Sequence, residues 1–323
     1  MNELDLAIVI VNWNVRELLA ACLEALFRFQ LSAFSFQVVV VDNASRDGSV
    51  EMVRGRFPQV RLIANSHNEG FAGGNNQGLR ELGLGARHST QSIETRNPKS
   101  ETQGPDRPRY VLLLNPDTLV REGAIAAMVD FMDRTPQAGA CGARLVYGDG
   151  SFQHSAFGFP GLAQIGLDFW PLHGRLLESR LNGRYPRRLY AAGRPFEVDH
   201  PLGAALMVRA EAIAHAGLMD EGFHMYCEEI DWCWHIKAAG WRIYCVPQAE
   251  IVHYGGQSSA QARPEMIVAL WRSRKRLYTT YYPAWKRRLA FALVRAGARA
   301  QAGRLPDAAL ANAYRQVGEM FKT

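Results

Sequence analysis

The chain has 323 residues, of which 48% are hydrophobic and 21% are charged, a composition that is typical of a folded globular protein and excludes a disordered one. No apolar run reaches membrane-spanning length, because Arg, Lys or Gly interrupts every candidate. The N-terminus lacks the basic start and the small-residue cleavage site of a signal peptide, so we expect a cytoplasmic protein.

Five cysteines, an odd number without a Cys-x-x-Cys pair, predict reduced and mostly buried thiols rather than a disulfide framework or a zinc site. The net charge is +6, and much of the excess lies near the C-terminus. Between Trp271 and Arg304 there are ten Lys or Arg residues and no Asp or Glu. Such a local basic segment indicates more about partners than the global charge does.

Strand and helix signals alternate along the first part of the chain. Short apolar runs rich in Val, Ile or Leu predict strands at residues 6–11, 37–41, 60–64 and 110–114. Amphipathic stretches predict helices at residues 16–29, 48–57 and 74–84. This alternation indicates an α/β fold with a mostly parallel central sheet flanked by helices. Polar residues follow each strand, at the sheet edge where such folds bind ligands.

The rest of the chain is less regular. Residues 85–109 are rich in Ser, Thr, Gln, Pro and charged residues, which predicts a flexible insertion. Residues 152–196 form an aromatic, Gly- and Pro-rich segment, which predicts an irregular excursion rather than a second sheet. Ordered elements are then predicted at residues 198–209, 228–239 and 242–246, and the chain after Pro264 is predicted to be helical, basic and amphipathic. We therefore expect one domain over residues 1–260 and a basic helical C-terminal extension over residues 261–323.

Two motifs have the composition of nucleotide-binding segments. Asp42 follows four consecutive valines, and a carboxylate at a strand end can accept a hydrogen bond from a uracil or thymine ring; an Asx-turn or helix cap is the alternative. Residues 68–78 form a Gly/Asn-rich stretch, in which a turn at Gly73 and Gly74 would let backbone amides approach phosphate. A tight loop with glycines at positive φ is the alternative there.

Candidate metal ligands follow two of the predicted strands. Asp117 and the carbonyl of Asn115 are hard oxygen ligands of the kind that suits Mg²⁺ or Mn²⁺. A Pro-containing turn that caps the next helix is the alternative reading of this segment. His253, after the last strand, could supply a neutral imidazole to the same metal.

Three carboxylates, those of Glu228, Glu229 and Asp231, lie within four positions at a predicted helix start. The helix dipole favours acidic residues there, which is a structural explanation. Three anions this close also repel one another, which raises the pKa of one of them and leaves a usable general base. The neighbouring Cys227 and Cys233 match no standard zinc spacing.

Taken in order, these motifs resemble the family 2 glycosyltransferases with a GT-A fold, especially the bacterial rhamnosyltransferase-like branch. The matching segments are Val9–Trp13, Val40–Ser45, Gly70–Asn76 with Gly78, Leu113–Asp117, Gly203–Ala204 and Glu228–Asp231. The similarity runs from about Leu6 to Ser258 and leaves out the insertion, residues 158–194 and the C-terminal tail.

The resemblance implies an inverting glycosyltransferase that moves a sugar, rhamnose in that branch, from a dTDP- or UDP-sugar to a hydroxyl of a glycan or lipid-linked acceptor. The implied donor-binding residues are Asn12, Trp13, Asp42, Asn43, Gly73, Gly74, Asn75 and Asn115. Asp117 and His253 would hold Mg²⁺ or Mn²⁺, and Glu229 would be the catalytic base. This sequence departs from the family pattern in having Asn115 for a metal-motif carboxylate and Glu228-Glu229 for Glu-Asp, so Asp231 and Glu228 stay alternative bases.

Aromatic and cationic residues are interleaved between residues 271 and 291, a pattern that suits the surface of an anionic membrane. Packing of the aromatic side chains on the catalytic domain is the alternative, and we expect no nucleic-acid partner. Two other functions compete with glycosyl transfer. A nucleotidyltransferase would carry a Gly-rich basic loop where this chain has Asn12-Trp13-Asn14. A catalytically silent nucleotide-sugar-binding protein of the same fold would not need Asp117, Glu229 and His253.

Overall fold

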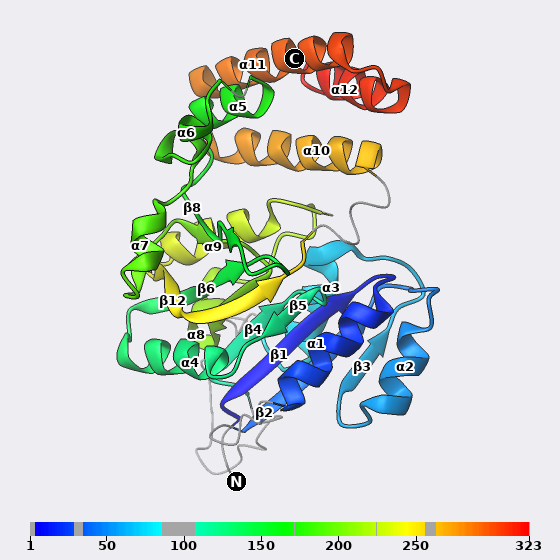
Figure 1. Cartoon of the computed structure of the whole chain (residues 1–323), viewed down its shortest axis with the longest axis vertical. Helices are drawn as coiled ribbons and strands as arrows, with labels where there is room; N and C mark the ends of the chain where they lie inside the picture. Colours follow the sequence, from blue (N-terminus) through cyan, green and yellow to red (C-terminus); the bar gives the residue numbers. More distant parts are fainter. Residues whose placement is uncertain are drawn as a thin grey trace, which may run out of the picture.

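The computed structural model describes residues 4–28, 35–85, 107–170, 172–223, 225–255 and 263–322. Residues 86–106, which make up most of the predicted flexible insertion, lie outside the described residues. A central sheet with helices on both faces forms the larger part of the molecule, and a stack of helices near the C-terminus lies at one end of it (Figure 1).

Ten strands form the central sheet. They are β1 (Leu6–Asn12), β2 (Phe36–Asp42), β3 (Arg61–Ala64), β4 (Tyr110–Leu114), β5 (Thr118–Val120), β6 (Ala138–Val146), β7 (Phe152–Gln153), β9 (Phe196–Glu197), β11 (Ala205–Arg209) and β12 (Arg242–His253). The main path runs β3-β2-β1-β4-β11-β6-β12-β5, with β7 beside β6 and β9 beside β12. The short strands β8 (Ala156–Phe157) and β10 (His200–Pro201) pair separately.

Strands β1 to β4 form the parallel half that the apolar runs predict, because β1 pairs in parallel with β2 and β4, and β2 with β3. Both faces of β1, β4 and most of β2 are buried, whereas β3 lies at the edge of the sheet and is partly exposed. Leu6 and Ile8 of β1 pack into one hydrophobic core, and Ala7 and Val9 pack into the other. A strand buried on both faces needs continuous rather than alternating apolar residues, which is the pattern in this sequence.

Helices cover both faces of the sheet. Those on the first face are α1 (Arg16–Arg28), α2 (Ser49–Arg56) and α4 (Ala124–Arg134), and those on the second are α3 (Gly70–Glu81), α8 (Ala210–Ala216) and α9 (Glu228–Ala238). The segment between β8 and β9 contains α5 (Leu162–Phe169), α6 (Gly174–Leu177), the 3-10 helix η1 (Arg180–Asn182) and α7 (Arg187–Ala191). All five cysteines are free and buried, as their number and spacing predict.

The predicted turn at Gly73–Gly74 is wrong, because both residues lie inside α3, which begins at Gly70. These glycines allow the helix to approach the sheet closely. A Cβ atom on Gly74 would lie 2.8 Å from Cγ1 of Val11, and one on Gly78 would lie 2.5 Å from Cγ1 of Val9. Both distances are shorter than packed atoms tolerate, so the motif is explained by helix–sheet packing.

The apolar runs predict neither the presence of β6 nor the full length of β12. The pattern gave no strand at β6, which contains Gly139 and Gly142; a side chain on Gly142 would collide with Pro201. The last strand was predicted to end at Val246 but runs to His253. Its register against β6 shifts between Val246 and Glu250, and such an irregularity interrupts the hydrophobic pattern without ending the strand.

The C-terminal helices are α10 (Arg263–Tyr281), α11 (Ala284–Arg304) and α12 (Ala308–Met320), and they share a third hydrophobic core with α5. Four aromatic residues from the predicted membrane-binding segment are buried in this core, namely Trp271, Tyr278, Tyr282 and Phe291. These four side chains are thus buried, as the packing alternative requires, but in a core that α5 and the C-terminal helices form apart from the two cores of the sheet. Within the described part of the chain, no helix combines the length and the hydrophobicity that crossing a membrane requires.

Candidate active site

A cavity of about 410 Å³ opens at the carboxyl ends of β1, β2 and β4, within the usual size of a small-molecule site. Its lining comes from the strand ends, the start of α3, the segment before β11, the start of α9, the end of β12 and the first turns of α10. The lining residues are Val11, Trp13, Asn43, Asn68, Gly70, Phe71, Asn115, Pro116, Asp117, Leu202, Gly203, Ala204, Met225, Tyr226, Glu228, Glu229, His253, Met266 and Ala269.

On the β1 and β2 side, Trp13 and Asn43 line the cavity, whereas Asn12 and Asp42 are buried beside it. The Asp42 carboxylate accepts a hydrogen bond from Asn12 Nδ2 at 2.8 Å and another from the backbone N–H of Ser45 at 2.8 Å. These bonds tie the loop after β2 to the end of β1. Asp42 thus has the turn-forming role, and its contact with a pyrimidine stays a prediction.

The predicted phosphate-binding residues of α3 do not line the cavity. Gly73 and Gly74 lie along the helix, and the Asn75 side chain donates a hydrogen bond to the backbone carbonyl of Phe71 at 2.9 Å. The first residues of the helix, Gly70 and Phe71, line the cavity instead. The motif therefore marks the correct element, with its cavity-facing residues three positions earlier than the turn interpretation expected.

Strand pairing brings Asp117 and His253 together. Strands β5 and β12 run antiparallel with His253 opposite Thr118, and Asp117 Oδ1 lies 3.4 Å from His253 Nε2. Both side chains are buried and line the cavity. On the other side of the imidazole ring, Nδ1 lies 3.2 Å from Gln153 Oε1. Donation of an Nδ1–H to this amide oxygen would leave Nε2 as the ring nitrogen that can bind a metal beside Asp117.

This pair fits two ligands of a divalent cation, with a carboxylate oxygen and an imidazole lone pair directed to the same region. The backbone carbonyl of Asn115 is already engaged, because it accepts a hydrogen bond from Thr118 Oγ1 at 2.7 Å. The described residues contain no group of three or more His, Cys, Asp or Glu side chains that could hold an ion. Further ligands would have to come from a bound diphosphate or from water.

The three acidic residues of α9 divide between two environments. Glu228 and Glu229 line the cavity. The side chain of Asp231 instead faces α10, where its Oδ1 accepts a hydrogen bond from the Tyr281 hydroxyl at 2.7 Å. Gly203 lies beside the base candidate, where a Cβ atom would be 3.5 Å from the Glu229 side chain, an ordinary van der Waals contact.

Burial raises the pKa of Glu229 to about 7. Burial, reinforced by the negative charge of Glu229, raises the pKa of Glu228 well above the usual range for a glutamate. Glu228 Oε2 has no hydrogen-bond partner among the described residues. Burial and a neighbouring negative charge both oppose ionisation of Glu228, so of the two cavity-lining acids Glu229 is the better candidate for a general base.

Four residues other than glycine have a left-handed backbone among the described residues, and each lines the cavity or precedes or follows a residue that does. They are Asn14 (φ 53°), Ala44 (φ 61°), Tyr226 (φ 69°) and Cys227 (φ 68°). Such a conformation costs about 1–2 kcal/mol per residue. Strained backbone gathers at functional sites because the surrounding structure holds reacting groups in place there. The strain at Tyr226 and Cys227 immediately precedes the two glutamates.

The family model described as "Glycosyltransferase like family 2" matches residues 4–276. The chain belongs to this family. The match includes the strand ends, the glutamates of α9 and most of α10, so it covers every residue that lines the cavity. This membership favours glycosyl transfer over the nucleotidyltransferase alternative.

This glycosyltransferase is similar to two rhamnosyltransferases. Over 255 residues it is 29% identical to the N-acetylglucosaminyl-diphospho-decaprenol L-rhamnosyltransferase of Mycobacterium tuberculosis (strain ATCC 25618 / H37Rv), covering 77% of this chain and 76% of the relative. Over 57 residues it is 37% identical to the rhamnosyltransferase WbbL of Escherichia coli (strain K12), which covers 18% of this chain and 22% of that protein.

Two solved structures have a similar fold. One is GalNAc-T7, crystallised with UDP, GalNAc and Mn²⁺, with a TM-score of 0.60 and 14% identity; the match covers 99% of this chain and 56% of that one. This glycosyltransferase thus spans little more than half of the GalNAc-T7 chain. The other is the mannosyltransferase PcManGT of Pyrobaculum calidifontis with GDP-Man and Mn²⁺, with a TM-score of 0.53 and 17% identity, covering 99% and 85%. These likenesses show that the fold is GT-A.

Sequence reasoning missed the contribution of α10. Met266 and Ala269 line the cavity from a segment that the motifs did not include. Neither residue type carries a chemical signal, and only the packing of α10 against the loop before α9 brings them there. Ser273 contributes to that packing by donating a hydrogen bond from its hydroxyl to the backbone carbonyl of Met225 at 2.7 Å.

Proposed function

We propose that this glycosyltransferase transfers a sugar, with inversion, from a dTDP- or UDP-sugar to a hydroxyl of a lipid-linked glycan, and that dTDP-rhamnose is the first donor to test. The names of the two rhamnosyltransferase relatives support the sugar, and the diphospho-decaprenol in one of them supports the acceptor. The observation that carries the proposal is one cavity that gathers a glutamate with a pKa near 7 and the Asp117–His253 pair.

Donor binding would use the β1, β2 and β4 side of the cavity. Trp13 would present an aromatic face to the nucleoside, and Asn43 would present a polar group. Asp42 would stabilise the loop after β2 through its hydrogen bond with the Ser45 N–H. The diphosphate would extend toward Asp117 and His253, which would hold Mg²⁺ or Mn²⁺. When bound, the ion would supply positive charge that offsets the charge of the departing diphosphate.

Glu229 would act as the base in a single in-line displacement. As the acceptor oxygen bonds to the anomeric carbon, its proton passes to the Glu229 carboxylate, and the bond from that carbon to the nucleoside diphosphate breaks. Attack opposite the leaving group inverts the anomeric centre. Asp231 is a weaker candidate because it does not line the cavity and accepts a hydrogen bond from Tyr281, and Glu228 is weaker because burial and the charge of Glu229 raise its pKa and oppose its ionisation.

A transfer assay tests the proposal directly. Purified protein would be incubated with dTDP-rhamnose, or with UDP-sugars as controls, and a GlcNAc-diphospho-lipid acceptor in the presence of Mg²⁺ or Mn²⁺. We expect a glycosylated lipid and free nucleoside diphosphate in equal amounts. If no donor is turned over although dTDP or UDP still binds, the alternative of a catalytically silent binding protein would replace our proposal.

We also infer that the protein contacts the surface of an anionic membrane, where lipid-linked acceptors are located. Most aromatic side chains of residues 271–291 are buried and cannot reach a membrane. We therefore place the contact on the outer face of α11, where Trp285 is exposed. Trp285 and Leu289 are 66% and 45% exposed one helical turn apart, and Arg288 lies exposed beside them. A large aromatic and an aliphatic side chain next to cations is the arrangement that favours the headgroup region.

A further inference from the structure

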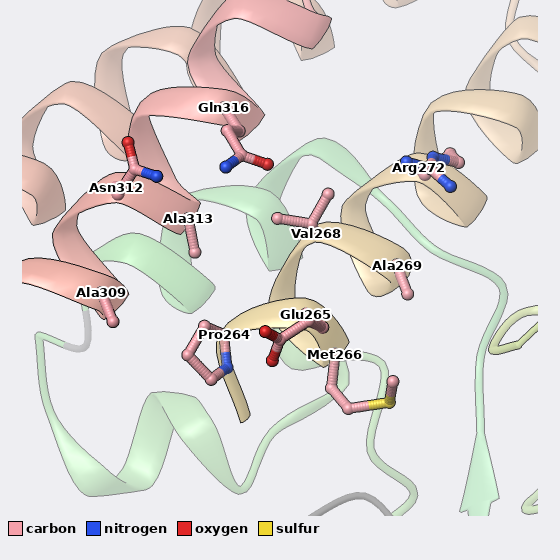
Figure 2. A pocket seen from close by; sticks show the side chains of 10 residues that line it. All are labelled: Pro264, Glu265, Met266, Val268, Ala269, Arg272, Ala309, Asn312, Ala313 and Gln316. Atoms are coloured by element: carbon pink, nitrogen blue, oxygen red, sulfur yellow. The ribbon is translucent and has the colours of Figure 1, made fainter. Parts of the chain in front are cut away.

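A second cavity, of about 490 Å³, lies between α10 and α12 (Figure 2). Its walls are mostly apolar, with Val268 and Ala269 on α10 and Ala309 and Ala313 on α12. Because the alanine side chains on the facing surfaces of α10 and α12 are small, a space remains between the two helices. We call this cavity the α10–α12 groove. It has the size and apolar lining of a ligand site, yet none of the proposed steps uses it.

The α10–α12 groove adjoins the catalytic cavity. Met266 and Ala269 line both of them, so only the first turns of α10 separate the two spaces. A molecule whose reacting end lies beside Glu229 could therefore cross α10 and extend into the groove. This adjacency limits the occupants to molecules that reach the catalytic cavity, which is where the acceptor must be.

One cation at the groove lacks a partner. Arg272 is exposed, and no carboxylate among the described residues forms an ion pair with it. The next arginines along α10 differ, because Arg274 pairs with Asp168, and Arg276 pairs with Asp220 at 2.5 Å. Glu265 also lines the groove, seven residues before Arg272 on the same helix, and is exposed as Arg272 is.

Residues 266–306 contain no Asp or Glu at all. The groove itself is lined by one carboxylate, Glu265, and one guanidinium, Arg272, and α11 adds only cations nearby in the chain. It lies next to the cavity that would hold the glycan hydroxyl under the proposed function. An apolar space, an unpaired guanidinium and a neighbouring sugar-binding cavity match the three parts of a glycan-diphospho-isoprenoid. A guanidinium is well suited to a diphosphate, because its planar fork of N–H groups can donate two hydrogen bonds to phosphate oxygens.

We propose that the α10–α12 groove binds the isoprenoid chain of a lipid-diphosphate acceptor and that Arg272 pairs with the diphosphate. The inference rests on the proposed function in so far as that function names a lipid-linked acceptor. It assigns acceptor recognition to the C-terminal helices, whereas the donor is recognised by the strand ends of the sheet. The chain segment nearest the diphosphate occupies the groove.

Binding of farnesyl diphosphate to the full-length protein, measured by titration calorimetry, tests this assignment. Saturating dTDP is included so that the donor site cannot bind the diphosphate of the probe. We expect Ala309→Trp, which fills the groove from its exposed side, and Arg272→Ala each to raise the Kd about tenfold or more. Ala296→Trp and Arg299→Ala, exposed positions of α11 outside the groove, are the matched controls and should bind as the wild type does.

Three results would overturn the assignment: no binding by the wild type, equal binding by Ala309→Trp and wild type, or displacement of the probe by an equal concentration of inorganic diphosphate. A parallel transfer assay separates this inference from the proposed function. If transfer occurs but groove variants bind the probe normally, the groove assignment alone is wrong. If groove-dependent binding is seen but no sugar is transferred from any donor, the proposed function alone fails.

Discussion

Glu229 owes its suitability as a base to its surroundings rather than to its side-chain chemistry. An ordinary glutamate is fully ionised near neutral pH but is a weak base, and burial raises the pKa of Glu229 to about 7. Its carboxylate thus combines a substantial ionised fraction with greater basicity. The raised value has a clear consequence for pH dependence, because only the ionised form can accept the acceptor proton.

We predict that kcat/KM for transfer rises with pH through about 7 and then levels off. Below that value Glu229 is protonated in the free enzyme and inactive as a base; above it the carboxylate is present. Glu229→Gln should lower kcat by at least about a hundredfold while dTDP affinity stays unchanged. The profile is measured from initial rates between pH 5.5 and 8.5. Near-normal transfer by Glu229→Gln together with an inactive Asp231→Asn would move the base to Asp231.

Asp117, His253 and Gln153 form a chain of contacts that can be tested by metal affinity. We predict that Asp117→Ala and His253→Ala abolish Mn²⁺ binding to the protein that holds dTDP, whose diphosphate would supply the remaining ligands. Gln153→Ala should weaken it by about 10–100-fold, because the His253 ring would lose the partner that fixes its orientation. Electron paramagnetic resonance of free Mn²⁺ measures this without turnover. Mn²⁺ affinity that is unchanged in Asp117→Ala, or full wild-type activity in excess chelator, would remove the metal role.

The sequence allowed prediction of polar residues that the structure brings into one cavity, but not of the residues that only shape that cavity. Asp117, Glu229 and His253 could be named because their positions match a family pattern, and their chemical roles stay predictions. Tyr226, Met266 and Ala269 could not be named, because their place in the cavity depends on a strained backbone and on helix packing. Neither leaves a trace in residue type or spacing.

At the level of elements, the predictions were most accurate where one local signal was enough. Strands β1, β2 and β4 are largely buried on both faces, so their apolar runs are continuous. The predicted bounds of these strands and of the edge strand β3 differ from the observed ones by one residue at most. The start of α3 was misplaced because glycine usually indicates a turn. Here the glycines are needed because α3 approaches β1 closely. The two elements are far apart in the sequence, so no local signal reveals this contact.

Gly78 and Gly55 provide a matched test of that explanation, since both are helical glycines. Gly78→Ala should destabilise the protein by about 1–3 kcal/mol, because its Cβ atom would collide with Val9 at 2.5 Å. Gly55→Ala in α2 has no atom within 4 Å of the new Cβ atom and should stabilise by up to about 1 kcal/mol. Urea unfolding followed by circular dichroism measures both. Equal effects of the two substitutions would mean that close packing does not explain the glycines of α3.

At the scale of the whole molecule, α10 joins the catalytic sheet to the C-terminal helices. Tyr281 stacks on Trp234 of α9 with ring centroids 4.0 Å apart and also donates a hydrogen bond to Asp231. The family match ends at residue 276, inside α10. The helix is therefore shared between the family's catalytic part and the third core. The boundary at residue 260 that composition indicates stays a prediction, but α10 contacts the catalytic part on one side and α12 on the other.

The exposed face of α11 is where this arrangement would meet a membrane. Because Trp271, Tyr278, Tyr282 and Phe291 are committed to the core, they cannot insert among lipid headgroups without unfolding the helices. Trp285 can, since two thirds of its surface is exposed. Cations near an anionic surface contribute about 1 kcal/mol each, so Arg288 and its neighbours add an attraction that salt would weaken.

We predict that the protein co-sediments with vesicles containing anionic lipid at low salt, that binding weakens as salt rises, and that neutral vesicles bind little. Trp285→Ser combined with Leu289→Ser should lower the bound fraction several-fold, since the apolar contact would be lost while the charge is kept. Leu181→Ser is the control, because Leu181 is 56% exposed on η1, outside α11. If the double variant binds like the wild type, any attraction is electrostatic and α11 does not insert. If the wild type does not co-sediment with anionic vesicles at low salt, the inferred membrane contact is wrong. The acceptor would then have to reach the catalytic cavity from solution.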